Sequence, residues 1–162
     1  MTTPKNVSSL LVVCLGNICR SPTAEAVLRA RAQTRGIMVN IDSAGTAGYH
    51  QGNPPDKRSQ QAGQARGYSF AGIRARQVRQ EDFADFDMIL AADENNLADL
   101  HAQCPADYQN KLSLFLSWGE QTEGAIPDPY YGGDDGFEHV LDLLEQAADG
   151  VLDHIVAKTN AQ

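Results

Sequence analysis

The sequence predicts an α/β fold with a parallel sheet and helices on both faces, and three observations support this prediction. Short apolar runs alternate along the chain with stretches of helical pattern, which is typical of parallel sheets. The first apolar run leads through a short loop into Ser21-Pro22, a typical helix start. The last stretch repeats its apolar residues at helical spacing. At 162 residues the chain suits one domain, spanning residues 1–162.

The composition is that of an acidic protein of a reducing compartment. Lysine and arginine total 13 against 21 aspartates and glutamates, which gives a formal net charge of −8. This charge argues against nucleic acid or a membrane surface as a partner, because both favour a basic face. Three cysteines do not form a disulfide framework. No apolar run is long enough for a signal peptide or membrane span, so we expect a cytoplasmic protein without membrane insertion.

The first strand and helix flank the short loop. Residues 10–13 form an apolar run that predicts a buried strand. A helix is expected over 21–35, with Ser21 as N-cap and Pro22 at the first helical position. Gly36 then ends the helix as a left-handed cap.

The middle of the chain continues the alternation of strands and helices. Strands are expected over 37–43, 86–92 and 111–116, and helices over 57–66 and 93–103, the first closed by Gly67 and the second opened by an acidic cap. Two Gly/Pro-rich loops, 44–56 and 119–133, separate these elements. Long loops in a small domain are usually functional.

The last helix has the clearest periodicity in the sequence. Asp135 and Glu138 resemble a capping box at its start. Gly150 costs about 1 kcal/mol relative to alanine in a helix, so a bend or break is expected there. The apolar positions fall on one face that should pack against the sheet: Phe137, Val140, Leu141, Leu144, Ala148, Val151, Leu152 and Ile155.

The loop that starts at Cys14 and ends at Arg20 predicts an anion site. A short loop between a strand end and a helix start must curl, so that its backbone N–H groups converge on one point. Gly16 and Asn17 tolerate the left-handed backbone that such a curl requires. Arg20 adds a planar charged fork for phosphate oxygens, and the same positive field favours the thiolate of Cys14. The phosphate-binding residues are therefore expected to be Leu15, Gly16, Asn17, Ile18, Cys19 and Arg20.

A nucleophile that attacks phosphorus needs an acid to protonate a basic leaving group. Asp128 is the candidate, because the segment Ile126-Pro127-Asp128-Pro129 is stiffened by its two prolines. Aspartate before proline is also common in ordinary turns, so the residues alone leave both interpretations open.

Three motifs carry a resemblance to a known family. C-L-G-N-I-C-R-S-P at 14–22, D-S-A-G-T at 42–46 and D-P-Y-Y-G at 128–132 together resemble the low-molecular-weight protein tyrosine phosphatases, from about residue 10 to the last helix. The resemblance implies a four-stranded parallel sheet and hydrolysis of protein phosphotyrosine through a phosphocysteine intermediate, without a cofactor. It implies Cys14 as nucleophile, Arg20 as phosphate clamp and Asp128 as general acid and base.

The resemblance also implies supporting residues. Asn17 would hold the strained loop, Ser21 would hydrogen-bond the thiolate, and Ser43 would join their network. Many relatives have a histidine where this chain has Ile73, so we expect the buried network to be rewired.

Further residues are expected at the rim of the site. Tyr130 and Tyr131 would form the pocket wall, with Tyr49 on the opposite side, so that a flat phenyl ring enters and phosphoserine does not reach the thiolate.

Cys19 is expected to be a redox partner for Cys14, five residues away in one loop, whereas Cys104 is expected to be structural. The four histidines lack ligand spacing, so no metal site is expected, and we expect a monomer.

Three alternatives remain at this point. A thiol-coupled arsenate reductase needs two further cysteines close together, and only Cys104 remains. A protein arginine phosphatase on the same scaffold would resemble C-T-G-N-T-C-R-S, with threonine where this chain has Ile18. A non-catalytic phosphate-binding module has no use for both a nucleophile and an acid.

Overall fold

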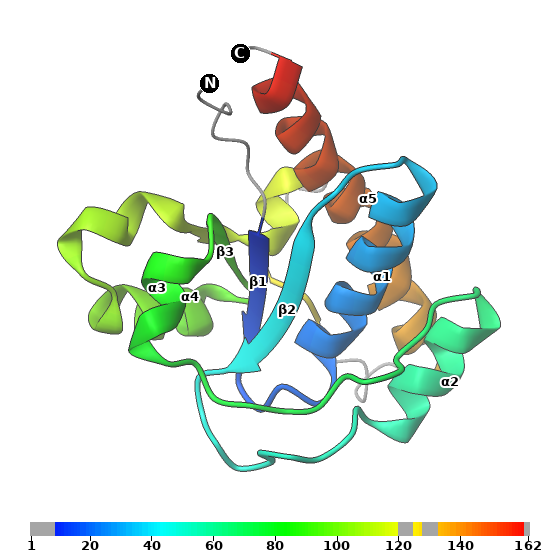
Figure 1. Cartoon of the computed structure of the whole chain (residues 1–162). Coiled ribbons are helices and arrows are strands. Elements are labelled where there is room, and N and C mark those ends of the chain that lie inside the picture. The colour runs from blue at the N-terminus through cyan, green and yellow to red at the C-terminus, as the bar shows by residue number, and fades with distance from the viewer. Residues whose placement is uncertain (1–8, 120–124, 128–132, 161–162) are drawn as a thin grey trace.

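The predicted α/β fold is confirmed. A computed structural model of the chain describes residues 9–119, 125–127 and 133–160. Four parallel strands form one sheet in the order β2-β1-β3-β4 (Figure 1). The elements are β1 (Ser9–Cys14), α1 (Arg20–Thr34), β2 (Asn40–Gly45), α2 (Lys57–Ala65), α3 (Gln80–Asp85), β3 (Met88–Ala91), α4 (Glu94–Gln103), η1 (Ala106–Lys111), β4 (Leu112–Leu114), η2 (Phe115–Trp118) and α5 (Gly133–Asn160).

The strand order places the end of β1 at the switch point of the sheet. The chain leaves β1 for β2 on one side and later returns to β3 on the other side. In register, Cys14 lies opposite Gly45 of β2, and Val13 lies opposite Ala91 of β3. Ligands of open α/β sheets bind beyond the carboxyl ends of the strands at such a point. The loop that follows Cys14 therefore occupies the place where an anion site was expected.

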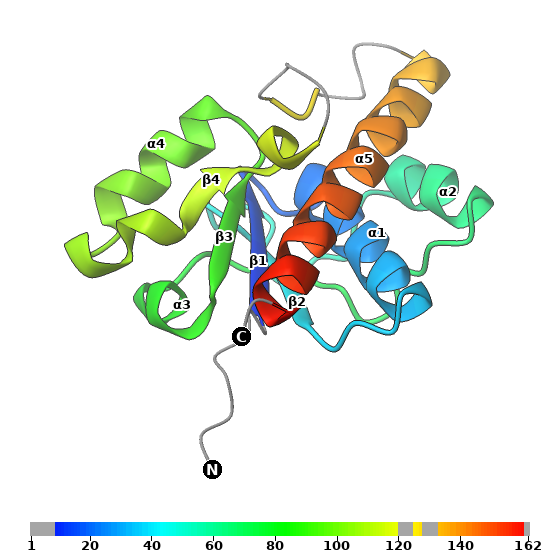
Figure 2. The ribbon, with the colours of Figure 1, turned by 90° about the horizontal axis from the view of Figure 1, so that it is seen from above.

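Helices cover both faces of the sheet, as Figures 1 and 2 show: α1 and α5 lie on one face, and α3 and α4 on the other. The side chains of β1 alternate between the two cores. Leu10, Val12 and Cys14 join the core under α1 and α5, whereas Leu11 and Val13 join the core under α3 and α4. Because β1 is buried on both faces, it appears in the sequence as a continuous apolar run rather than an alternating one.

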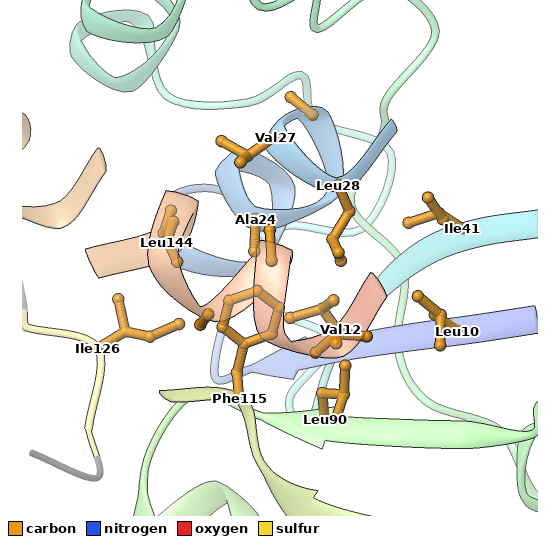
Figure 3. Packing of buried hydrophobic residues seen from close by; sticks show 14 of the residues in the cluster. Leu10, Val12, Ala24, Val27, Leu28, Ile41, Leu90, Phe115, Ile126 and Leu144 are labelled. Carbon is orange, nitrogen blue, oxygen red and sulfur yellow. The ribbon is translucent and has the colours of Figure 1, made fainter. Parts of the chain in front are cut away.

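The core under α1 and α5 holds the helix that starts at the loop. In Figure 3, Val12 of β1, Leu28 of α1, Phe115 of η2 and Leu144 of α5 pack together between the sheet and the helices. These side chains are all fully buried, which confirms that the apolar stripe of the last helix packs against the sheet. Since burying a side chain of this size contributes about 1.5–3 kcal/mol, this contact fixes α1 firmly under the loop.

Several boundaries differ from the prediction. Helix α1 begins at Arg20 with Cys19 as its N-cap, so Ser21 is inside the helix and is not the N-cap. Strand β2 begins only at Asn40, after Gly36 ends α1 with φ of 68°, the left-handed cap that was expected. Helix α3 and η1 were missed, because segments this short show no periodicity. The strand expected over 111–116 ends at Leu114, and η2 takes the place of its last two residues.

Helix α5 is longer and more regular than predicted. It begins at Gly133, two residues before the expected start at Asp135, and it continues through Gly150 without a break. A Cβ at Gly150 would lie 1.7 Å from the carbonyl oxygen of Trp118. The glycine therefore allows η2 to approach the helix closely and does not interrupt it. No helix in the described part of the chain combines the length and apolar character that crossing a bilayer requires.

Candidate active site

The loop between β1 and α1 has a left-handed residue at its centre. Asn17 has φ of 58°, a conformation that asparagine tolerates better than most residues, as predicted. Gly16, which also tolerates this conformation, does not adopt it, since its φ is not positive. Instead, a Cβ at Gly16 would lie 3.0 Å from Cδ2 of His50. A side chain at this position would require the imidazole ring of His50 to move slightly.

The carbonyl groups of the loop are held by the surrounding backbone. Cys14 and Leu15 accept from the N–H groups of Thr46 and Ala47 at 2.9 and 3.0 Å, and Ile18 accepts from Asp56 at 2.7 Å. In a trans peptide unit the N–H points opposite to the C=O. The N–H groups of residues 15, 16 and 19 therefore point away from these partners, toward the inside of the loop. This is the orientation that an anion nest in front of the N-terminus of α1 would require.

The thiol of Cys14 lies at the foot of this loop and is almost fully buried. Its sulfur is 2.9 Å from the hydroxyl oxygen of Ser21, and the backbone N–H of Asn17 donates to it at 3.3 Å. Donors of this kind stabilise a thiolate more than a neutral thiol. The Ser21 side chain is thus directed at Cys14, and this explains why it does not cap the helix.

The three residues that were expected to support the loop lie together. The side-chain amide nitrogen of Asn17 donates to the hydroxyl oxygens of Ser21, at 2.8 Å, and Ser43, at 3.0 Å. The amide oxygen of Asn17 accepts from the backbone N–H of Arg76 at 3.0 Å. All three polar side chains are at most 1% exposed, so each hydrogen bond is protected from water. The network links β1, α1 and β2 directly behind the thiol.

The far end of this network is a residue that the sequence analysis missed. Ile73, at the position where many relatives have a histidine, lies in the apolar core. Ser43 donates its hydroxyl hydrogen to Oε1 of Glu25 at 2.6 Å. Glu25 is 2% exposed, and its other oxygen contacts Nη2 of Arg29 at 2.5 Å. The available signal was the spacing of residues 21, 25 and 29, which places a serine, a glutamate and an arginine on one face of a helix.

Arg20 is held at the mouth of the loop by Asp93, the N-cap of α4, and by the backbone carbonyl of Ile126. Its Nη1 donates to Oδ2 of Asp93 at 2.9 Å and to the carbonyl of Ile126 at 3.1 Å. Among the described residues, no acceptor contacts Nε or Nη2 of Arg20, so these atoms can face an anion. Asp93 also caps α4 as predicted, because its Oδ1 accepts from the N–H of Asn96 at 2.7 Å. Its second contact, with Arg20, was not predicted.

The double contact of Asp93 leads to a testable prediction. Asp93→Asn keeps an oxygen for the cap of α4 but removes the charge that holds Arg20. Because a hydrogen bond between charged groups contributes about 1.5–3 kcal/mol and this pair is partly exposed, we expect inorganic phosphate to bind about tenfold more weakly. Isothermal titration of phosphate would measure this, with thermal unfolding as the control. Asp93→Ala should lower the unfolding temperature as well, since it also removes the cap. Unchanged phosphate affinity in Asp93→Asn would exclude a role in holding Arg20.

The rim of the site is only partly described. Leu15 and Tyr49 are exposed, and the segment that contains Tyr49 bonds to the loop through Ala47. Asp128, Tyr130 and Tyr131 lie outside the described residues.

Ile126, which lies two residues before Asp128 in the chain, is held by two hydrogen bonds. The backbone N–H of Ile126 donates to Ala92, just after β3, at 2.7 Å, and its carbonyl accepts from Arg20. The chain two residues before Asp128 is therefore anchored beside the phosphate loop.

Comparison with known proteins agrees with this geometry. The family model described as low molecular weight phosphotyrosine protein phosphatase matches residues 9–161. A putative low molecular weight protein-tyrosine-phosphatase of Synechocystis is 49% identical over 147 residues, covering 88% of this chain and 93% of the relative. The human low molecular weight phosphotyrosine protein phosphatase is 47% identical over 140 residues, covering 82% and 85%.

Solved structures show the same fold at similar coverage. YfkJ from Bacillus subtilis superposes with a TM-score of 0.86 at 38% identity, covering 96% of this chain and 99% of that one. The product-state mimic of a protein tyrosine phosphatase from Entamoeba histolytica gives a TM-score of 0.85 at 39% identity, covering 90% and 93%. With the cysteine, the arginine and the anchored loop in one place, these matches show that the chain is an enzyme of the low molecular weight phosphotyrosine protein phosphatase family.

Proposed function

We propose that the protein removes phosphate from protein phosphotyrosine through a phosphocysteine intermediate on Cys14. The observation that carries this proposal is the pair of polar contacts of the Cys14 sulfur, with the Ser21 hydroxyl at 2.9 Å and with the Asn17 N–H, which donates to it at 3.3 Å. A thiol that only filled the core would have no need of two polar donors. Arg20, with two nitrogens free of described acceptors, is the phosphate clamp.

The reaction follows from these positions in two steps. The Cys14 thiolate attacks phosphorus, a P–S bond forms, and the P–O bond to the tyrosine oxygen breaks. Asp128 gives its proton to the departing phenolate, whose pKa is otherwise about 10. Asp128 then takes a proton from water, which attacks phosphorus and breaks the P–S bond, so that inorganic phosphate and the thiolate are released. The loop N–H groups and Arg20 stabilise the oxygens on phosphorus during both steps.

The rim residues support an aromatic substrate. Leu15, within the loop, and Tyr49 both have exposed apolar surface, which we propose contacts a phenyl ring. Tyr130 and Tyr131 complete this proposed wall, which would hold the phosphate of phosphoserine away from Cys14.

Initial rates on matched peptides test the proposed substrate class. One peptide sequence is made with phosphotyrosine, phosphoserine or phosphoarginine and is assayed in the presence of a chelator. We expect phosphotyrosine to be hydrolysed more than about 10²-fold faster than phosphoserine, because only the longer side chain reaches the thiolate. Fastest hydrolysis of phosphoarginine would instead support the arginine phosphatase alternative.

We propose that Cys19 protects Cys14 during oxidation. Peroxide oxidises the Cys14 thiolate to a sulfenic acid and is reduced to water. The Cys19 thiolate then attacks that sulfur, forming a disulfide and releasing hydroxide. The Cys19 sulfur lies 3.1 Å from the hydroxyl of Ser59 on α2, so it must turn away from α2 to reach Cys14.

We therefore expect brief peroxide treatment to inactivate the wild type reversibly. In Cys19→Ser, a smaller fraction of activity should return with thiol, because sulfenic acid proceeds to sulfinic acid. Mass spectrometry would identify the Cys14–Cys19 disulfide, and Cys104→Ser is the matched control that should behave as wild type. Only sulfinic acid on Cys14 of the oxidised wild type would contradict the proposal.

A further inference from the structure

Glu25 is a buried carboxylate that the proposed reaction does not use. It lies on α1, one turn after Ser21, and is 2% exposed. Burial raises the pKa of Glu25, whereas the hydrogen bond from Ser43 and the positive charge of Arg29 lower it. A buried charge is costly unless it is paired. The structure supplies both an ion pair and a hydrogen bond, so this carboxylate has a defined place in the network.

The direction of each hydrogen bond in the network follows from its chemistry. The backbone N–H of Arg76 can only donate, so the atom of Asn17 that faces it must be the amide oxygen. The amide nitrogen of Asn17 therefore uses its two hydrogens for Ser21 and Ser43. Each serine oxygen accepts from Asn17 and keeps its own hydrogen for another partner.

Glu25 determines where one of these two hydroxyl hydrogens goes. Oε1 of Glu25 accepts the hydrogen of Ser43 at 2.6 Å, and this holds the Ser43 oxygen toward Asn17. The hydrogen of Ser21 has two possible acceptors, the Cys14 sulfur at 2.9 Å and the carbonyl of Ala44 at 3.5 Å. The orientation of the Asn17 amide decides between them, because it fixes the position of the Ser21 oxygen.

We propose that Glu25 is a positioning residue for Cys14. Held by Arg29, its carboxylate orients Ser43 and Asn17 so that the Ser21 hydroxyl donates its hydrogen to the Cys14 sulfur. The proposal rests on the proposed function in one respect, namely that the thiolate of Cys14 is the reacting form. Only a carboxylate satisfies both neighbours, since it offers one oxygen to Ser43 and one to Arg29.

Glu25→Gln tests this role without changing the shape of the side chain. Arg29 can only donate, so the single amide oxygen of the glutamine turns toward Arg29, and its N–H₂ group faces Ser43. The Ser43 hydroxyl hydrogen then loses its acceptor in a buried position. Ser43 and Asn17 must shift to satisfy it, and the hydrogen bond from Ser21 to Cys14 weakens.

The readout is the reactivity of the Cys14 thiolate, which does not depend on turnover. Alkylation by the neutral reagent iodoacetamide is followed against pH by mass spectrometry, with Cys104 in the same molecule as internal reference. We expect Glu25→Gln to slow alkylation of Cys14 at pH 6 about three- to tenfold, the effect of losing about one hydrogen bond to the thiolate. Alkylation of Cys104 is expected to be unchanged.

A double-mutant cycle with Ser21→Ala identifies the route. If Glu25 acts through the Ser21 hydroxyl, Glu25→Gln has almost no further effect on alkylation in the Ser21→Ala background. Arg35→Gln is the matched control, because it removes an ion pair between α1 and Asp153 of α5 at the far end of the helix. It should leave the alkylation profile unchanged.

Three results would overturn the proposal. Faster alkylation in Glu25→Gln would mean that the charge of Glu25 acts by simple repulsion of the thiolate. An equal slowing in the Ser21→Ala background would mean that the effect bypasses Ser21. A lower unfolding temperature with an unchanged alkylation profile would mean a purely structural role. Because alkylation needs no phosphorylated substrate, failure of the proposed phosphatase activity would be seen separately.

Discussion

Cys14→Ser is expected to abolish turnover and to keep binding of inorganic phosphate or vanadate. A serine hydroxyl in the same position is not ionised at neutral pH, so no phosphoenzyme forms. The N–H groups of residues 15, 16 and 19 and the Arg20 side chain do not contact the sulfur, and the loop is anchored through its own carbonyl groups. Single-turnover assays and isothermal titration would measure the two properties. Turnover that persists in Cys14→Ser, with contamination excluded, would remove the covalent mechanism.

Arg20→Ala is the companion experiment and should lose both properties. The expected loss of turnover exceeds about 10²-fold, comparable to removal of an oxyanion-hole donor. Phosphate binding should fall as well, since Arg20 is the side-chain cation that we propose holds the phosphate. Arg35→Ala, at the other end of α1, is the control for loss of a charge on the same helix.

Asp128→Asn is expected to make the rate depend steeply on the leaving group. If Asp128 donates a proton to the departing oxygen, its contribution grows with the basicity of that oxygen. A nitrophenolate leaves fairly well unaided, whereas an alkyl-substituted phenolate with a pKa of about 10 does not. General acid catalysis contributes about 10² to 10⁴-fold. In Asp128→Asn, aryl phosphates with basic leaving groups should therefore lose most of this rate contribution, and those with activated leaving groups little of it.

Single-turnover rates on a series of substituted phenyl phosphates, measured for both proteins, test this expectation. The wild type should give a nearly flat dependence on the pKa of the leaving group, and the variant a steep one. The limb of the pH profile that requires a protonated carboxyl should vanish in the variant. Two parallel lines that differ only by an offset would mean that Asp128 shapes the loop and another group is the acid.

The parts of the fold that were predicted are those that follow from local pattern. The continuous apolar run of β1 and the short loop after it predicted a parallel sheet with a loop at its carboxyl edge, and the sheet is confirmed. That this loop binds an anion stays a prediction. The periodicity of α5 predicted its packing face. Boundaries were less accurate, because the first turn of α1 is set by the loop rather than by Ser21.

The parts of the site that were missed depend on contacts distant in the chain. Glu25 looks like a surface residue of an alanine-rich helix until β2 places Ser43 against it. Asp93 looks like a plain helix cap, and only the parallel pairing of β1 with β3 brings it to Arg20. The spacing of residues along the sequence predicts neither the contact of Glu25 with Ser43 nor that of Asp93 with Arg20. The role of Asp128 depends on residues outside those that the structure describes, so it stays a prediction.

The order in which the strands pair has a consequence for how the protein is made. Most of the residues proposed to react or to position the thiol leave the ribosome early, within β1, α1 and β2. Strand β1 nevertheless needs β3 as its other neighbour, and the apolar face of α1 needs α5, the last helix to be synthesised. The core that packs against β1 and α1 is therefore complete only once α5 has been synthesised. We expect the site to reach its final geometry only at that stage, so that a chain ending within α5 should lack activity.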